Sequence, residues 1–154
     1  MPRAAPTTTG LLIIAHAPLA SALMQCVLHV FPDAQQFIGV VDVPSNAAVD
    51  EVLTQARQEL QRLPQPQVLV LADVFGATPC NIAQKLIADP RCQLVTGVNL
   101  PMLLRACTYR NEGLDALVGR ALAGASQGVM QVVGTAPQTR SQTRHDPDTH
   151  HHTQ

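Results

Sequence analysis

Two polar residues in this chain stand directly after short apolar runs. His16 follows residues 10–15, and Asp73 follows residues 68–72. Both runs are too short for a helix and rich in aliphatic side chains, which predicts buried strands. In open α/β sheets the carboxyl ends of the strands form the rim where ligands bind. His16 and Asp73 are therefore the first candidates for chemistry.

An imidazole and a carboxylate can act as a pair. A carboxylate that accepts a hydrogen bond from Nδ1–H fixes the tautomer and orientation of the ring, which leaves Nε2 as a nucleophile. The two side chains meet if the first and third strands are neighbours, as in the flavodoxin-like order 2-1-3-4, whose crevice lies between them. Plainer interpretations remain open, namely a rim histidine bound by backbone for His16 and a capping or loop acid for Asp73.

The segment that follows Asp73 has the features of an anion site. Gly76-Ala77-Thr78-Pro79 precedes a predicted helix, with Thr78 as its N-cap and Pro79 at its first position. The free N–H groups and positive dipole of such a terminus suit a phosphoryl group. Gly76 allows close approach of the backbone, and the Thr78 hydroxyl can donate a further hydrogen bond. By itself, however, the segment is more typical of an ordinary capped helix.

Strands and helices alternate along the chain. The pattern predicts strands at 10–15, 37–42, 68–72 and 92–98, helices at 20–31, 47–63, 78–88, 101–109 and 114–123, and a short last strand at 129–133. For the second helix we expect an N-cap at Ser45 or Asn46. Because the first four strands are nearly continuous apolar runs, they belong to a parallel sheet covered on both faces, a doubly wound α/β fold.

The composition excludes several classes of protein. The chain has 154 residues, enough for one domain, and 46% of them are hydrophobic. A net charge of -1, no basic stripe and only 3% aromatic residues argue against nucleic-acid binding. No apolar stretch approaches the roughly 20 residues of a membrane span, and no signal peptide is recognisable. The four cysteines show no C-x-x-C spacing, so we expect mostly buried, reduced thiols in a cytoplasmic protein.

Missing motifs narrow the chemistry further. There is no G-x-x-x-x-G-K-[ST] for a nucleoside triphosphate and no G-x-G-x-x-G for a dinucleotide. The first strand does not end in the acidic pair of a magnesium site, and its loop lacks the Ser, Thr and Gly run that holds a flavin phosphate. We therefore expect no cofactor and no metal. A phosphoryl group handled without either suggests transfer from one histidine to another.

Three separated segments then carry a family resemblance. Residues 10–20, 73–81 and 96–102, in this order, resemble the IIA component of the mannose/fructose/sorbose type in the bacterial phosphoenolpyruvate:sugar phosphotransferase system. The resemblance implies a flavodoxin-like core in which His16 accepts a phosphoryl group from the histidine-containing phosphocarrier protein and passes it to a IIB component, with Asp73 as the partner of His16. It also implies a homodimer that exchanges the strand at 129–133.

The sequence departs from that family at two points. Ala17 follows the histidine where the family usually has glycine, and Gly76-Ala77-Thr78-Pro79 replaces a frequent Gly-Gly-Ser-Pro. Both changes keep the chemistry plausible while affecting rate or choice of partner.

The resemblance extends over one predicted domain. We expect a flexible N-terminus at 1–9, the phosphocarrier domain at 10–133 and a disordered polar tail at 134–154. Since no IIB domain follows, the chain is expected to be a freestanding subunit that reaches a membrane only through a permease complex. Gly76, Ala77 and Thr78 would receive the phosphoryl oxygens. The surface for partner proteins would include Leu19, Phe75 and Met102, although packing in the core is an open alternative for Met102.

Three other functions fit parts of the sequence. In a regulatory module, phosphorylated His16 would be read by a partner protein, and the absence of a fused IIB domain slightly favours this. A receiver-like domain would be phosphorylated on Asp73, but the acidic pair after the first strand is missing. A small metal hydrolase has too few ligands. Elsewhere, His29 is expected to be a surface or capping residue, and Asp42 a solvated loop acid or part of the rim.

Overall fold

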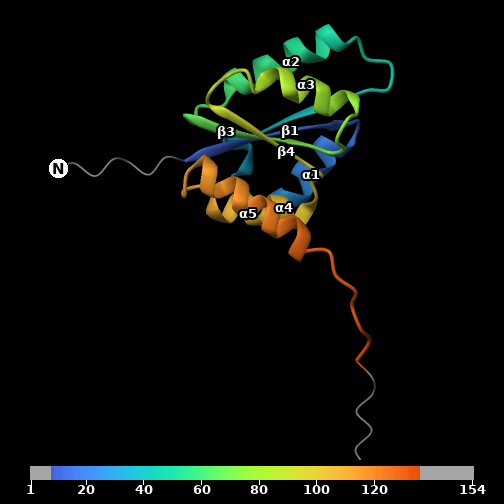
Figure 1. Ribbon diagram of the computed structural model, residues 1–154, viewed down its shortest axis with the longest axis vertical. Helices are drawn as coiled ribbons and strands as arrows, with labels where there is room; N and C mark the ends of the chain where they lie inside the picture. Colours follow the sequence, from blue (N-terminus) through green and yellow to red (C-terminus); the bar gives the residue numbers. More distant parts are fainter. Residues whose placement is uncertain (1–7, 136–154) are drawn as a thin grey trace, which may run out of the picture.

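A parallel sheet forms the middle layer of the molecule (Figure 1). The computed structural model describes residues 8–135. Within them the sheet has four strands in the order β2-β1-β3-β4, which confirms the predicted order. The strands are β1 (Thr9–His16), β2 (Ile38–Val43), β3 (Gln67–Ala72) and β4 (Cys92–Thr96). Because β1 and β3 are hydrogen-bonded neighbours, the residues that follow them leave the sheet side by side.

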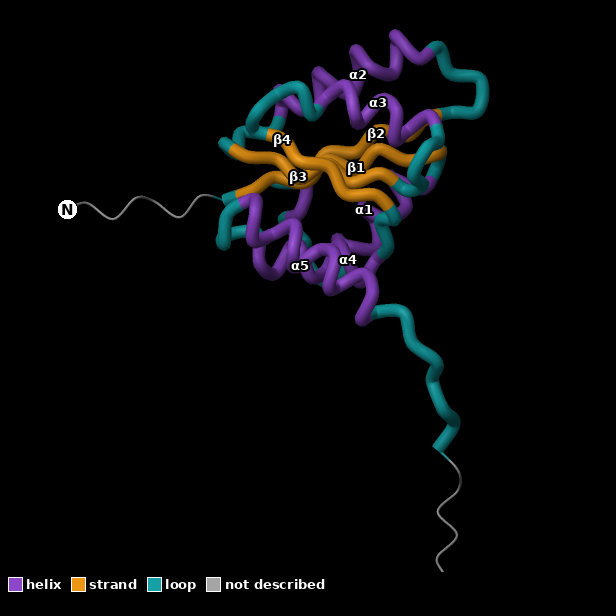
Figure 2. Tube along the Cα trace, in the orientation of Figure 1, coloured by secondary structure: helices purple, strands orange, loops and turns teal. Residues whose placement is uncertain are grey.

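Helices cover both faces of the sheet (Figure 2). One face is covered by α2 (Val49–Arg62) and α3 (Thr78–Leu86). The other carries α1 (Leu19–Leu28), α4 (Leu100–Tyr109) and α5 (Leu114–Gln127), while the short 3-10 helix η1 (Ala34–Gln36) precedes β2. This double covering is why the apolar runs of β1 and β3 are continuous rather than alternating.

Each strand contributes to two hydrophobic cores in turn. Leu11 and Ile13 of β1 pack with α1, α4 and α5, whereas Leu12 and Ile14 pack with α2 and α3. All four side chains are fully buried. The alternation follows from the twofold side-chain period of a strand, so one apolar run anchors both layers and holds His16 at its end.

Two predicted helix caps are wrong. Thr78 is the first residue of α3, and Ala77 is its N-cap; α2 begins after Ala48 rather than after Ser45 or Asn46. Neither alanine supplies a side-chain acceptor, but both have the extended backbone that an N-cap requires. The start of each helix is therefore set by the path of the loop that leads into it. The capping preference of nearby side chains does not set it.

Asn99 provides a cap that ties two helices together. Its Oδ1 accepts the N–H of Met102 in the first turn of α4, and its Nδ2 donates to the carbonyl of Ala125 near the end of α5. The two contacts satisfy a free donor of one helix and a carbonyl of the other. They hold the start of α4 against the end of α5.

The predicted last strand at 129–133 is wrong for the single chain. These residues form no strand and lead away from the body of the molecule (Figure 1). A strand needs a neighbour for its backbone hydrogen bonds, and no strand lies beside this segment within residues 8–135. The side chains of Val129 and Val132 are 74% and 85% exposed. Pairing with a second chain stays a prediction.

The predicted domain boundaries can be compared only in part. Thr9 was expected in a flexible N-terminus, but it is fully buried as the first residue of β1. The predicted tail, apart from its first two residues, lies outside the described residues, as do residues 1–7. Among the described helices, none combines the length and the apolar character needed to cross a membrane.

The cysteines are mostly buried, as predicted. Cys80, Cys92 and Cys107 are buried, and Cys26 is exposed. Burial raises the pKa of the Cys92 thiol to about 11, and burial likewise raises the pKa of the Cys107 thiol to about 12. Both thiols therefore stay protonated and unreactive at neutral pH.

Two glycines of α5 lead to opposite expectations. A Cβ at Gly124 would lie 2.7 Å from Cβ of Arg105 on α4, whereas a Cβ at Gly119 meets nothing within 4 Å. Gly119→Ala should stabilise the fold by about 0.5–1 kcal/mol through helix propensity. In Gly124→Ala, overpacking of about 1–3 kcal/mol outweighs that gain, so net destabilisation is expected.

Urea unfolding of the two variants and the wild type measures this difference. Gly119→Ala is the matched control, because it makes the same change in the same helix without the contact. Equal stabilisation by both variants would contradict the close packing of α4 on α5.

Candidate functional site

His16 and Asp73 are in direct contact at the carboxyl ends of β1 and β3. The distance between Nδ1 of His16 and Oδ2 of Asp73 is 2.7 Å. The same Oδ2 accepts the backbone N–H of His16 at 3.0 Å, and Oδ1 accepts the N–H of Val74 at 2.9 Å. One carboxylate thus holds both the ring and the backbone of His16. The adjacency follows from strand order, because Ile14 of β1 is paired with Ala72 of β3.

This contact sets the tautomer of the histidine. An ionised carboxylate can only accept hydrogen bonds, so Nδ1 carries the proton and Nε2 keeps its lone pair. The His16 side chain is 52% exposed, whereas that of Asp73 is 7% exposed. The ring of His16 is therefore accessible from solvent, and the carboxylate that orients it is shielded.

The environment of Asp73 keeps it ionised. Burial acts to raise the pKa of this carboxyl. The hydrogen bonds from the His16 backbone, the His16 ring and the Val74 backbone outweigh burial, with a further contribution from electrostatic attraction to His16. The net pKa lies below the ordinary value of 3.8, so Asp73 is an acceptor throughout the neutral range.

The N-terminus of α3 faces the same hollow as His16. His16 and Thr78 line a common pocket of about 300 Å³. The N–H groups of Thr78 and Cys80 in the first turn of α3 have no acceptor within residues 8–135, and Pro79 has no N–H to satisfy. Free donors and the positive end of the helix dipole thus lie beside the histidine, as an anion site requires.

Sequence reasoning missed the other wall of this pocket. The end of β2, the loop that follows it and the first residue of α2 line it through Val43, Pro44, Ser45, Ala47 and Val49. The signal was present in the predicted strand order, because β2 is the second neighbour of β1. The predicted crevice between β1 and β3 did not include the loop that follows β2.

Asp42 has a structural task next to the site. Its carboxylate accepts the N–H of Ser21, at 3.1 Å, and also the Ser21 hydroxyl. Ser21 lies in the first turn of α1, whose own N-cap, Pro18, supplies no side-chain acceptor. Asp42 therefore caps α1 from the neighbouring strand and fixes the helix that starts just after His16. It is not a freely solvated acid, and its hydrogen bonds within the described part of the chain do not reach the histidine.

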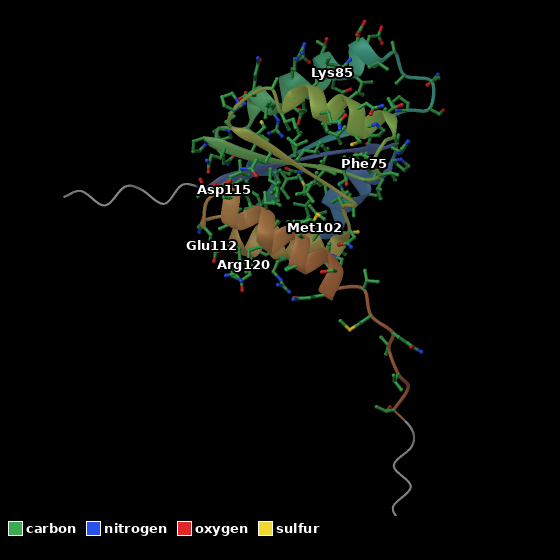
Figure 3. The ribbon with its side chains drawn as sticks, in the orientation of Figure 1. Phe75, Lys85, Met102, Glu112, Asp115 and Arg120 are labelled. Atoms are coloured by element: carbon green, nitrogen blue, oxygen red, sulfur yellow. The ribbon has the colours of Figure 1, made fainter. Side chains whose placement is uncertain are left out.

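Two of the three side chains predicted for the partner surface are exposed, and the third is buried. Phe75 is 77% exposed and Leu19 is 37% exposed. Figure 3 shows Phe75 at the end of the sheet opposite Asp115. Met102 is only 1% exposed, because it lies on the face of α4 that packs against the sheet. The prediction for Met102 is wrong, since its side chain belongs to the core and cannot contact a partner.

Gly76 has a conformational role in front of α3. Its φ angle of 82° lies in the left-handed region, and a Cβ there would meet nothing within 4 Å. Gly76→Ala should therefore cost about 1 kcal/mol from backbone strain alone. Urea unfolding measures the cost, with Ala77→Gly as the control at an extended position. An unchanged stability of Gly76→Ala would contradict the left-handed turn.

The chain is similar in sequence to several known proteins. The family model EIIA-man, described as "PTS system fructose IIA component", matches residues 10–122. The PTS system fructose-specific EIIA component of Bacillus subtilis is 31% identical over 105 residues, which cover 67% of this chain and 71% of that protein. The PTS system mannose-specific EIIAB component of Escherichia coli is 27% identical over 99 residues, 62% of this chain. The match spans only 31% of that longer protein.

Solved structures show the same fold. The mannose/sorbose specific IIA subunit from Enterococcus faecalis superposes with a TM-score of 0.75 at 21% identity, covering 84% of this chain and 98% of that one. The phosphotransferase system component EIIA from Streptococcus agalactiae gives a TM-score of 0.71 at 22% identity, covering 80% and 96%. The predicted α/β fold class is thereby confirmed.

Proposed function

We propose a phosphocarrier function for this chain, which belongs to the EIIA-man family of phosphotransferase system (PTS) IIA components. Members of this family are components of a phosphoryl-transfer system for sugars. We assign the phosphorylated atom to Nε2 of His16. The observation that carries this assignment is the 2.7 Å contact of Nδ1 with Asp73, which leaves Nε2 as the free nucleophile on a half-exposed ring.

The transfer step balances without metal or cofactor. Neutral Nε2 of His16 attacks the phosphorus of a donor phosphohistidine whose other ring nitrogen carries a proton, so that one P–N bond forms as the other breaks. The donor ring leaves neutral, and positive charge appears on the His16 ring, which retains its Nδ1 proton. Asp73 stabilises that charge at the atom it already contacts. In the reverse sense, the same ring releases the phosphoryl group to the next acceptor.

The start of α3 would bind the phosphoryl oxygens. The N–H groups of Thr78 and Cys80 have no acceptor within residues 8–135, and the Thr78 hydroxyl is a further donor. Thr78 itself borders the pocket that His16 lines. Such positioning and preorganised donors supply most of the catalysis in phosphoryl transfer. Gly76 turns the chain ahead of these donors, and Ala77 leads it into the first turn of the helix.

The partners would dock on the exposed apolar side chains around the rim. Phe75 and Val74 are 77% and 54% exposed, and Leu19 lies nearby in sequence after His16. We propose the histidine-containing phosphocarrier protein as donor and a IIB component as acceptor, both meeting this chain in the cytoplasm. A shared docking surface is sufficient, because the two transfers occur at different times.

The receiver-like alternative has less support. Asp73 would have to be the nucleophile, but its side chain is 7% exposed and both of its oxygens accept hydrogen bonds. A carboxylate held in this way can orient a neighbour but presents no free oxygen to a donor.

Reconstitution tests the proposed function. The protein is incubated with phosphoenolpyruvate, enzyme I and the phosphocarrier protein, and its intact mass is followed. We expect the mass of one phosphoryl group to be added, to be lost in acid and kept in base, and to disappear when a IIB component is supplied. Omission of the phosphocarrier is the control. A base-labile adduct would indicate an acyl phosphate and contradict the assignment to histidine.

We also propose that residues 129–133 pair with a second copy of this chain. Four of the five side chains are apolar and 70–85% exposed, namely Val129, Met130, Val132 and Val133. An added strand at the edge of the partner's sheet would satisfy their backbone and cover these side chains. Sedimentation equilibrium should show a dimer that Val132→Lys with Val133→Lys weakens. A monomeric wild type would contradict the exchange.

A further inference from the structure

A second hollow lies at the other end of the sheet from His16. It is formed by the last turns of α2 and α3 and by the residues between α3 and β4, and it encloses about 380 Å³. We call it the α2–α3 pocket. Its position follows from topology, because these helices end where the parallel strands begin, whereas His16 and Asp73 stand where strands end. Figure 3 shows Lys85 in this helical layer.

The α2–α3 pocket is positively charged. Arg57, Lys85 and Arg91 line it together with a single carboxylate, Asp89, which leaves a net charge of +2 in a chain whose overall charge is -1. Asp89 forms its ion pair with Arg91. Neither Arg57 nor Lys85 has an ion-pair partner among the residues that the structure describes.

Arg91 is held in place inside the pocket. Its Nη2 donates to the carbonyl of Leu60 at 2.9 Å, and its Nε donates to Asp89 at 3.3 Å. Asp89 also accepts the backbone N–H of Arg91 at 3.0 Å. Nη1 makes no hydrogen bond within residues 8–135, so this end of the guanidinium keeps its donors. A fixed arginine loses little freedom when it binds an anion.

The remaining lining is apolar. Leu60 of α2 and Leu86 of α3 are buried and contribute to the pocket wall. The pocket lining contains no aromatic side chain among the described residues on which a nucleobase could stack. Its volume lies near the lower end of the range for small-molecule sites.

We propose that the α2–α3 pocket binds a small phosphate monoester of the size of a sugar phosphate. A monoester dianion matches the net charge of +2, and the forked donors of arginine suit its oxygens. The carbon skeleton of the ligand would contact the leucine walls. Because the pocket lies away from the His16 rim, such a ligand and a docked partner protein can be bound together. Binding of the monoester does not require that His16 be phosphorylated.

An NMR titration of the full chain with glucose 6-phosphate tests the proposal. We expect saturable shift changes in the last turns of α2 and α3. Arg57→Gln and Lys85→Gln should each weaken binding about fivefold, as expected for one partly exposed ion pair. Arg105→Gln is the matched control, because it removes the same charge on α4 at the opposite face of the sheet. It should leave the affinity unchanged.

Three further titrations locate the bound anion and identify what the pocket recognises. If His16→Ala still binds glucose 6-phosphate, the result supports binding in the α2–α3 pocket. If His16→Ala no longer binds it, the anion binds at the histidine and the proposal is overturned. Equal binding of uncharged glucose would show that charge is not recognised and would also overturn it. Inorganic phosphate should bind more weakly than the monoester, and equal affinity would contradict the contact with the leucine walls. Absence of saturable binding ends the proposal.

Discussion

Replacement of His16 by alanine is expected to abolish phosphorylation of this chain while leaving it folded. The variant removes Nε2 of the ring held by Asp73, which is the atom that we propose as nucleophile. The His16 side chain is 52% exposed, so its removal creates no cavity. We expect a loss of at most about 1–2 kcal/mol from the missing hydrogen bond. Intact mass after reconstitution measures the first effect, and urea unfolding measures the second.

His29 provides the matched control for this experiment. It is exposed and stands directly after α1, at the opposite end of that helix from His16. His29→Ala should therefore accept a phosphoryl group at the wild-type rate. If His16→Ala still gains the mass of a phosphoryl group, another residue is the acceptor and the proposed function fails at its central point.

Replacement of Asp73 has the second largest expected effect. It should lower the rate at which His16 is phosphorylated, while His16 itself remains present as the acceptor. Without the carboxylate, the His16 ring can rotate, and both tautomers become populated. We expect Asp73→Ala to slow phosphorylation by about 100-fold, which is typical of a misplaced reacting group. The rate of phosphorylation under single-turnover conditions measures this. A wild-type rate would show that the contact is structural only.

The variant Asp73→Asn distinguishes orientation of the His16 ring by the carboxylate from packing of the Asp73 side chain alone. Asparagine keeps the shape of the side chain, and its carbonyl can still accept one backbone N–H. Its amide, however, can donate to Nδ1, which favours the tautomer that carries the proton on Nε2. Asn should therefore be as slow as Ala in transfer while it destabilises the fold less. A variant that is both stable and fast would contradict the tautomer argument.

The same variant reports the pH dependence of stability. The pKa of Asp73 in the folded protein lies below 3.8, so the unfolded state binds its proton at higher pH than the folded state does. Ionised Asp73 therefore stabilises the fold above about pH 4, and this contribution is lost as the pH falls through the folded-state pKa. The stability difference between wild type and Asp73→Asn should shrink from pH 7 to pH 2. A constant difference would contradict the lowered pKa.

Much of the site could be predicted because it depends on few elements. The apolar runs of β1 and β3 marked two buried strands, and the parallel order placed their ends together, so that His16 and Asp73 had to be neighbours. The signal for a buried strand lies within the strand's own sequence, because the run of aliphatic side chains is the part that becomes buried. The sequence suggested only that Gly76 allows close approach of the backbone, and its left-handed conformation is a finding of the structure.

Other features depended on contacts between distant segments. Met102 could be a surface or a core residue until the packing of α4 on the sheet buried it. Asp42 caps α1 only because β2 lies next to the start of that helix. The pocket beside His16 likewise takes one wall from the loop between β2 and α2. No local sequence pattern predicts these contacts, because each one depends on which helices and strands become neighbours in the folded chain.

The aliphatic runs and the polar residues that end them thus specified the sheet and the contact of His16 with Asp73, because burial acts on each segment through its own composition. Only the folded molecule decided the caps of α2 and α3, the walls of both pockets and the unpaired state of residues 129–133 in one chain. These features depend on backbone paths and on hydrogen-bond partners that come from segments far apart in sequence. The sequence of one segment alone therefore does not indicate them.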